Sequence, residues 1–202
     1  MKKLIAIAVI FATTSAMTFA QDCEGICQFN QFMSKNLKYG QEIRADKIQG
    51  PVTFSLNIDE QGQLKNKPEL IAGNELLAEE VFATLNLMDQ ENTIQHLGSE
   101  YYGKEFLMTV EFKLSTAKET GFYVPQESDR QYLDKLNKKI DANPYFPKYY
   151  RERAEFYEVK GKKLLAELDQ EKAELLKEKE ITSIVVVGYL ADPRRKSLNS
   201  ED

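Results

Sequence analysis

The sequence predicts an α+β protein, in which a small antiparallel sheet with two helices is followed by a helical hairpin. Two runs, 52–58 and 106–114, have apolar residues at every second position, a period that is typical of strands with one buried face. Other stretches repeat apolar residues every three or four positions, which indicates amphipathic helices. Up to residue 115 the predicted order is helix, strand, strand, helix, strand, which fits a small sheet covered by helices on one face.

Residues 1–20 have the pattern of a signal peptide. Two lysines precede an apolar stretch from Leu4 to Ala12, and Thr18, Phe19 and Ala20 provide a cleavage site with small residues. The pattern predicts a cleaved signal and secretion to the periplasm. The alternative is a retained membrane anchor, although hydroxyl side chains dilute the apolar stretch.

The only two cysteines, Cys23 and Cys27, are four positions apart and would lie one helical turn from each other. In an oxidising compartment such a pair can close a local disulfide, which we therefore predict. The alternative is two thiols near the amino terminus. The spacing differs from the Cys-x-x-Cys pattern of redox catalysts, and no further metal ligands lie nearby.

Residues 22–115 are predicted to form the sheet domain. The first helix ends near Gly40, and the first strand leads through a turn into a second strand at 63–72. Pro68 marks this second strand as an edge or a bulge, and Asn74 is placed to cap the second helix. The apolar stripes of the two helices are Ile26, Phe29, Met33 and Leu37, and Leu77, Val81, Leu85 and Met88.

Residues 128–180 are predicted to be helical, after a linker at 116–127. Ser128 and Gln131 fit a capping box at the start of the first helix. The helix ends at Asn143, because Pro144 follows it. A second helix is expected from about 147 to 160 and a third from 162 to 180. The charged side of the third helix, dense in Glu and Lys, is interpreted as a solvated face.

The tail, 181–202, begins with an uncharged β-forming run from Ile181 to Tyr189. An apolar strand is normally covered, because an exposed one promotes aggregation. The run is therefore predicted either to complete the protein's own sheet or to pair with a partner, and the sequence leaves both possibilities open.

Several runs within about 26–115 resemble the TonB C-terminal domain family: Lys35 to Tyr39, Ile48 to Val52, Ile58 to Gly62, Leu77 to Glu80, and the strand 106–114. The resemblance implies a protein-binding module that adds a short peptide to its sheet as an extra strand. The chain departs from the family at Gly40, where proline is common, and it has no Trp and no proline-rich spacer. These departures speak against energy transduction.

Two further resemblances concern the rest of the chain. The spacing of Ala154, Tyr157, Gly161, Ala166 and Ala173 is similar to that of a tetratricopeptide repeat, with a plain helical hairpin as the alternative. The end of the β-forming run resembles the TonB box, the receptor segment that TonB binds. The partner-binding residues implied are Ile184, Val185, Val186, Val187, Gly188 and Tyr189 in the tail, with Val110 and Phe112 on the sheet.

No pattern of catalytic residues is evident. The chain lacks nucleophile-elbow and phosphate-loop motifs, its one histidine is His96, and its net charge of −5 speaks against nucleic-acid binding. We therefore expect no enzyme activity, no cofactor and no metal.

The sequence instead predicts an exported, TonB-like adaptor of the cell envelope, linked to TonB-dependent transport. Its expected partners are protein segments, from a TonB domain or an outer-membrane receptor, and no transmembrane span is expected after signal removal. The alternative is a structural or assembly protein of the envelope in which the helical region carries the interaction.

Overall fold

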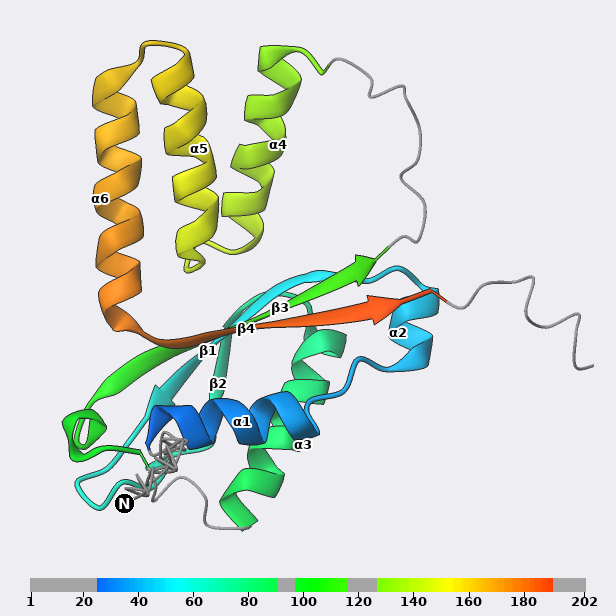
Figure 1. Ribbon diagram of the computed structural model, residues 1–202, viewed down its shortest axis with the longest axis vertical. Helices are drawn as coiled ribbons and strands as arrows, with labels where there is room; N and C mark the ends of the chain where they lie inside the picture. The colour runs from blue at the N-terminus through cyan, green and yellow to red at the C-terminus, as the bar shows by residue number, and fades with distance from the viewer. Residues whose placement is uncertain (1–24, 91–96, 116–126, 191–202) are drawn as a thin grey trace, which may run out of the picture.

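The computed structural model describes residues 25–90, 97–115 and 127–190 (Figure 1). Within these ranges the protein is α+β, as the sequence predicts, with six α-helices, a short 3-10 helix at Ser99–Tyr101 and a four-stranded sheet. The elements in chain order are α1 (Ile26–Asn36), α2 (Gln41–Ala45), β1 (Gly50–Asn57), β2 (Glu69–Ala72), α3 (Glu75–Gln90), β3 (Glu105–Ser115), α4 (Asp129–Ala142), α5 (Pro147–Val159), α6 (Lys163–Lys179) and β4 (Glu180–Tyr189).

The strand order in the sheet is β2-β1-β3-β4. β1 is antiparallel to both β2 and β3, whereas β4 is parallel to β3, with Ile184 opposite Val110. The sheet is therefore mixed and not purely antiparallel as predicted. A parallel pair needs a long crossover connection, which α4, α5 and α6 supply between β3 and β4.

The second strand is shorter than the predicted 63–72. β2 contains only Glu69–Ala72, and a single bridge between Ile58 and Leu64 extends the pairing. Pro68 immediately precedes β2, and because proline has no backbone N–H it cannot donate to a ladder at that position. The prediction of an edge strand at this point is confirmed.

One face of the sheet packs on α1 and α3, and its residues are the apolar positions of the predicted alternation (Figure 1). In the middle of β1 and β3 every second side chain is fully buried there, which is how a period of two places one set of residues in a core. The centre of this core consists of Val52, Phe54, Leu56, Met108, Val110 and Phe112 from the strands, Phe29 and Met33 from α1, and Leu77, Val81, Leu85 and Met88 from α3.

The opposite face is covered by α4, α5 and α6, whose lower ends meet the sheet (Figure 1). Leu107 of β3 packs there against a second buried cluster, whose other members are Ile140, Phe146, Tyr149, Tyr150, Ala173 and Leu176. The two central strands are consequently buried on both faces, and the polar side chains of Thr53 and Thr109 have no solvent exposure.

A buried amide connects this helical unit to the sheet. Asn143, the residue that ends α4, donates through Nδ2 to Oγ1 of Thr53 at 3.0 Å and to the carbonyl of Pro51 at 3.3 Å. Its Oδ1 accepts from the backbone N–H of Tyr145 at 3.1 Å. Thr53 and Thr109 in turn lie 3.1 Å apart through their hydroxyl oxygens. Hydrogen bonding of this kind offsets the cost of burying polar groups.

Candidate functional site

β4 forms an edge of the sheet and exposes one of its two faces. Its β-branched residues alternate between an α1-facing set, in which Thr182 and Ile184 are buried, and an outward set. In the outward set Val185 is 52% exposed, Val187 49% and Tyr189 65%. These three residues form what we call the β4 stripe, an apolar row over the last five residues of the ten-residue edge strand.

The outer edge of β4 lacks the usual protection of an edge strand. β2, at the other edge, is four residues long and has Pro68 before it and Glu69 as its first residue, and short length, proline and charge all discourage pairing with another chain. β4 has no charged residue and no proline from Ile181 to Tyr189. Apart from β3, no described element hydrogen-bonds to the backbone of residues 181–188.

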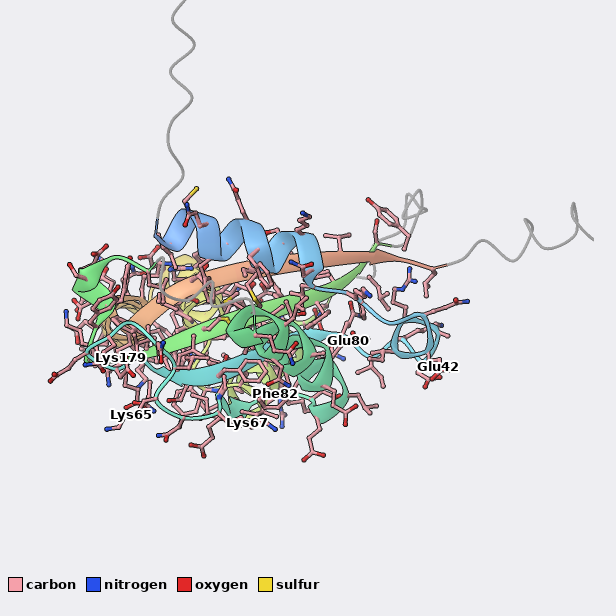
Figure 2. All side chains as sticks on the ribbon, turned by 90° about the horizontal axis from the view of Figure 1, so that it is seen from below. Glu42, Lys65, Lys67, Glu80, Phe82 and Lys179 are labelled. Atoms are coloured by element: carbon pink, nitrogen blue, oxygen red, sulfur yellow. The ribbon has the colours of Figure 1, made fainter. Side chains whose placement is uncertain are left out.

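The segment from α1 to α2 lies along β4 on the core side (Figure 2). At one end of the strand the hydroxyl of Thr182 donates to Oδ1 of Asn30 in α1 at 2.7 Å. At the other end Nη1 of Arg44 in α2 donates to the carbonyl of Tyr189 at 3.0 Å. The edge therefore has a fixed flank, with a cation at its carboxyl-terminal end.

Gly188 makes the close approach of this flank possible. A Cβ atom at this position would lie 2.5 Å from Cδ1 of Tyr39 and 2.6 Å from Cδ of Arg44. The Tyr39 ring also packs edge-on against Phe112, 5.1 Å between centroids, and its hydroxyl donates to the carbonyl of Ile48 at 2.6 Å. Burial raises the pKa of Tyr39, and the charge of Arg44 opposes this.

A cluster of ion pairs borders the β4 stripe on the neighbouring strand. Glu111 is paired with Val185 in the parallel register and is almost fully buried. Its carboxylate contacts Lys113 at 3.0 Å and Lys148 at 3.2 Å. The hydrogen bond to Glu111 raises the pKa of Lys113. The stripe therefore adjoins a satisfied ion-pair cluster and not an isolated charge.

The predicted partner-binding residues fall into two groups. Ile184 to Tyr189 lie in β4, so the tail pairs with the protein's own sheet. Val110 and Phe112 lie in β3, which is paired on both sides, and their side chains are in the core. A partner strand cannot pair with β3 while β4 is in place. Any strand addition on this side must therefore occur at the outer edge of β4.

Other predicted features lie at or beyond the limits of the described residues. Cys27 lies in the first turn of α1, whereas Cys23, the other half of the predicted disulfide, is outside the described residues, as are the signal segment and His96. The disulfide and the signal stay predictions. Residues 116–126 of the predicted linker and residues 191–202 of the tail also lie outside.

Sequence reasoning did not identify Arg44 or Tyr39 as site residues. Tyr39 appeared only within a run that resembles the TonB domain, and Arg44 lies in a five-residue helix, α2, that has no periodic signal. Gly188 was the one available indication in the sequence that another part of the chain contacts this strand, because a glycine within a strand marks a close approach of this kind.

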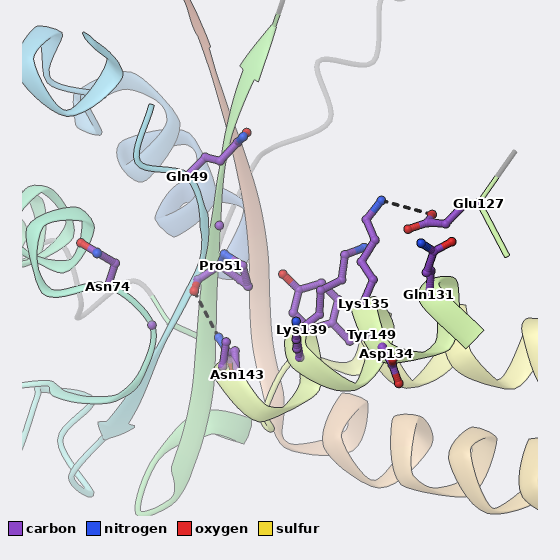
Figure 3. Close-up of a pocket in the computed structure, with 14 residues that line it drawn as sticks. Gln49, Pro51, Asn74, Glu127, Gln131, Asp134, Lys135, Lys139, Asn143 and Tyr149 are labelled. Atoms are coloured by element: carbon purple, nitrogen blue, oxygen red, sulfur yellow. Dashed lines mark hydrogen bonds and ion pairs between the residues drawn. The ribbon is translucent and has the colours of Figure 1, made fainter. Parts of the chain in front are cut away.

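A groove of about 880 Å³ lies between α4 and the start of β1 (Figure 3). Several of its polar side chains already have structural partners. Gln49 accepts from the N–H of Leu114 at 3.2 Å, Lys135 lies 3.7 Å from Glu127, and Asn143 binds Pro51 as described above. Because these groups stabilise the fold, the groove is a weaker candidate than the β4 edge.

No family model, curated protein or solved structure matches the chain in comparisons with known proteins. Among the residues that the structure describes, none of the helices is both long and apolar enough to span a membrane.

Proposed function

We propose that this protein is an exported, non-enzymatic adaptor of the cell envelope that binds an extended segment of another protein at the outer edge of β4. One observation carries the proposal: a ten-residue edge strand has an uncharged run at 181–189, and apart from β3 no described element bonds to its backbone at 181–188. An incoming segment would become a fifth strand of the sheet.

The chemistry of strand addition fits this edge. Main-chain hydrogen bonds to the free N–H and C=O groups supply affinity, and they do so for any extended sequence. Specificity comes from alternate side chains of the segment, because successive residues of a strand point to opposite faces. One set would lie against the β4 stripe, and the other would face the flank formed by α1 and α2.

The order of the first elements supports the proposal that residues 26–115 are TonB-like. Within these residues α1, β1, β2, α3 and β3 follow one another as the resemblance implies, with the five-residue α2 added between α1 and β1. We extend the proposal to periplasmic export and to a link with TonB-dependent transport, in which the bound segment belongs to a receptor or to a TonB domain.

A tetratricopeptide-like character of α5 and α6 is also part of the proposal. Ala154 and Ala166 are both buried, as close packing of the two helices requires, and Gly161 between the helices has φ of 69°, which favours glycine. Arg153 and Asp169 add an ion pair across the same interface.

An envelope assembly protein that interacts through its helical region is the second candidate. One specific observation favours it: α6 exposes Leu164, Leu168 and Leu175, at spacings of four and seven residues that place them on one helix face. A stripe of this kind is typical of a helix that packs against another helix.

Hydrogen exchange of the exported chain, with and without a synthetic peptide, tests the lead proposal. The probe is an eight-residue peptide of alternating threonine and valine, acetylated and amidated at its ends. We expect added protection within residues 181–189, because the outer amides of β4 acquire partners on pairing.

Two N-methylated versions of the peptide provide the matched control. Methyl groups on every second amide remove the donors that face β4 in one version and the donors that face solvent in the other. The version that lacks the donors facing β4 should lose binding, and the version that lacks the donors facing solvent should keep it. Equal binding of both versions, or protection that appears only on α6, would exclude strand addition, and the second result would favour the alternative function.

A further inference from the structure

We propose that Arg44 is a carboxylate-binding residue at the end of the β4 edge, and that the segment bound there carries a carboxylate opposite Tyr189. This inference rests on the proposed function and makes it more specific. It identifies one residue that would select among extended segments, which main-chain pairing alone cannot do.

The hydrogen bonds of Arg44 leave part of its guanidinium available. Nη1 donates to the carbonyl of Tyr189 at 3.0 Å, and Nε donates to the carbonyl of Gly40 at 3.4 Å. A guanidinium has five N–H donors, so three remain. The side chain is half-buried, yet no carboxylate of the described residues lies within ion-pair distance of it. An arginine in this state can accept an anionic ligand without first losing a partner.

The position of the guanidinium is fixed before a ligand arrives. The aliphatic part of the Arg44 side chain crosses β4 at Gly188, where the absence of a Cβ leaves the required space, and Tyr39 packs on the same glycine. The bond to the carbonyl of Tyr189 then holds the head group at the carboxyl-terminal end of the strand. A prepositioned side chain loses little conformational entropy on binding, so more of the interaction contributes to affinity.

The direction of the added strand determines where the carboxylate lies. Antiparallel pairing is slightly more stable per residue, and it would place the amino-terminal end of the segment beside Tyr189. The carboxylate would then be an acidic side chain near that end. In parallel pairing the carboxyl-terminal end lies there, and a free terminal carboxylate has the same chemistry. The greater stability of antiparallel pairing favours the first source, and peptides can distinguish the two.

The test uses four peptides based on the alternating threonine–valine probe, with affinities measured by fluorescence anisotropy. One begins with aspartate, one begins with asparagine, and both are acetylated and amidated. The third has the asparagine start and a free carboxyl terminus, and the fourth carries aspartate at its amidated carboxyl-terminal end. We expect the first peptide to bind roughly tenfold more tightly than the second at low salt, because charge-assisted hydrogen bonds are stronger than neutral ones.

Substitution of Arg44 provides the second arm. Arg44→Gln should abolish the preference for aspartate over asparagine, measured as the ratio of the two affinities, and Arg44→Lys should restore part of the preference. Circular dichroism of both variants reports whether the fold is kept. If Arg44→Gln does not fold, Arg44→Lys still tests the inference. Lysine keeps the positive charge but cannot form two parallel hydrogen bonds to a carboxylate, so the variant should retain only part of the preference for aspartate.

The outcomes separate the inference from the proposed function. Equal affinity of the wild-type protein for all four peptides, or an equal loss for every peptide in Arg44→Gln, would overturn the role of Arg44 and leave strand addition intact. A preference for either peptide with a carboxylate at its carboxyl-terminal end would identify parallel pairing, with Arg44 still the receptor. If no peptide binds, both the inference and the proposed function are wrong.

Discussion

Arg153 in α5 and Asp169 in α6 form a two-pronged ion pair, with Nε to Oδ2 at 2.7 Å and Nη2 to Oδ1 at 2.8 Å. Nη1 of Arg153 also donates to Oδ1 of Asn137 in α4 at 2.8 Å, so one guanidinium connects all three helices of the unit. The hydrogen bond to Asp169 raises the pKa of Arg153, which keeps this side chain charged.

Asp169→Asn should destabilise the protein strongly. The side chains of Arg153 and Asp169 are only 21% and 9% exposed, and removing one partner leaves a largely buried charge uncompensated. Such a loss costs about 3–5 kcal/mol when burial is complete, and we expect about 3 kcal/mol here because Arg153 retains some solvent contact. Urea unfolding measures the difference.

The exposed pair between Lys160 and Asp129 provides the control. Their 2.6 Å contact lies on the surface, where ion pairs contribute about 0–1 kcal/mol, so Asp129→Asn should have little effect. Equal destabilisation by the two asparagine substitutions would contradict the role assigned to the Arg153–Asp169 pair.

Asn143→Ala should weaken the attachment of the helical unit to the sheet. The substitution removes the Asn143 amide from the carbonyl of Pro51 and leaves the hydroxyl of Thr53 with Thr109 as its partner, and a buried group left unsatisfied costs about 1–3 kcal/mol. A double-mutant cycle with Thr53→Val, followed by thermal unfolding, should reveal coupling between the two sites. Strict additivity of the two substitutions would argue against the observed network.

Gly188→Ala should disturb the flank of β4. The new methyl group would overlap Tyr39 and the stem of Arg44, and overpacking of this kind costs about 1–3 kcal/mol. Val187→Ala, on the exposed side of the same strand, should change stability by no more than about 0.5 kcal/mol. If differential scanning calorimetry finds the two variants equally stable, Arg44 and Tyr39 do not pack on Gly188 as described.

Stability should fall at alkaline pH, and Tyr149 should contribute to this. Burial raises the pKa of Tyr149 above its ordinary value of 10.0, and the nearby carboxylates of Glu111 and Glu152 raise it further. Because the pKa is raised in the folded state, the stabilisation is complete below pH 10 and declines as the pH rises toward the folded-state pKa.

Tyr149→Phe should therefore reduce the loss of stability above pH 10, as measured by urea unfolding at a series of pH values. Tyr145→Phe is the matched control, since that side chain is exposed and its replacement should leave the pH profile unchanged. An identical alkaline decline in the wild-type protein and in Tyr149→Phe would show that the Tyr149 phenol is not the group responsible.

Elements whose pattern is local could be predicted from the sequence. The alternation at 52–58 and 106–114 predicts strands that the structure has as β1 and β3, since a period of two needs no knowledge of the partner strand. The capping box of Ser128 and Gln131 is confirmed at the start of α4, because its hydrogen bonds join residues only three positions apart.

The environment of each element was decided by the tertiary structure. Thr53 and Thr109 are the polar positions of strands predicted to have one buried face, yet both are buried because the helical unit and Asn143 cover them. The parallel pairing of β4 with β3, which leaves no free strand edge at Val110 and Phe112, could not be predicted either, since the pattern within a strand does not specify its neighbour.

The candidate site has the same two origins. The sequence determined that 181–189 would be an uncharged, β-branched strand, because side-chain type alone sets that tendency. Only the tertiary structure decided that this strand would have an outer edge to which no other described element bonds, with the guanidinium of Arg44 at its end. That arrangement joins residues 145 positions apart, and it depends on the packing of α2 over Gly188, which is a contact between distant parts of the chain that no local pattern records.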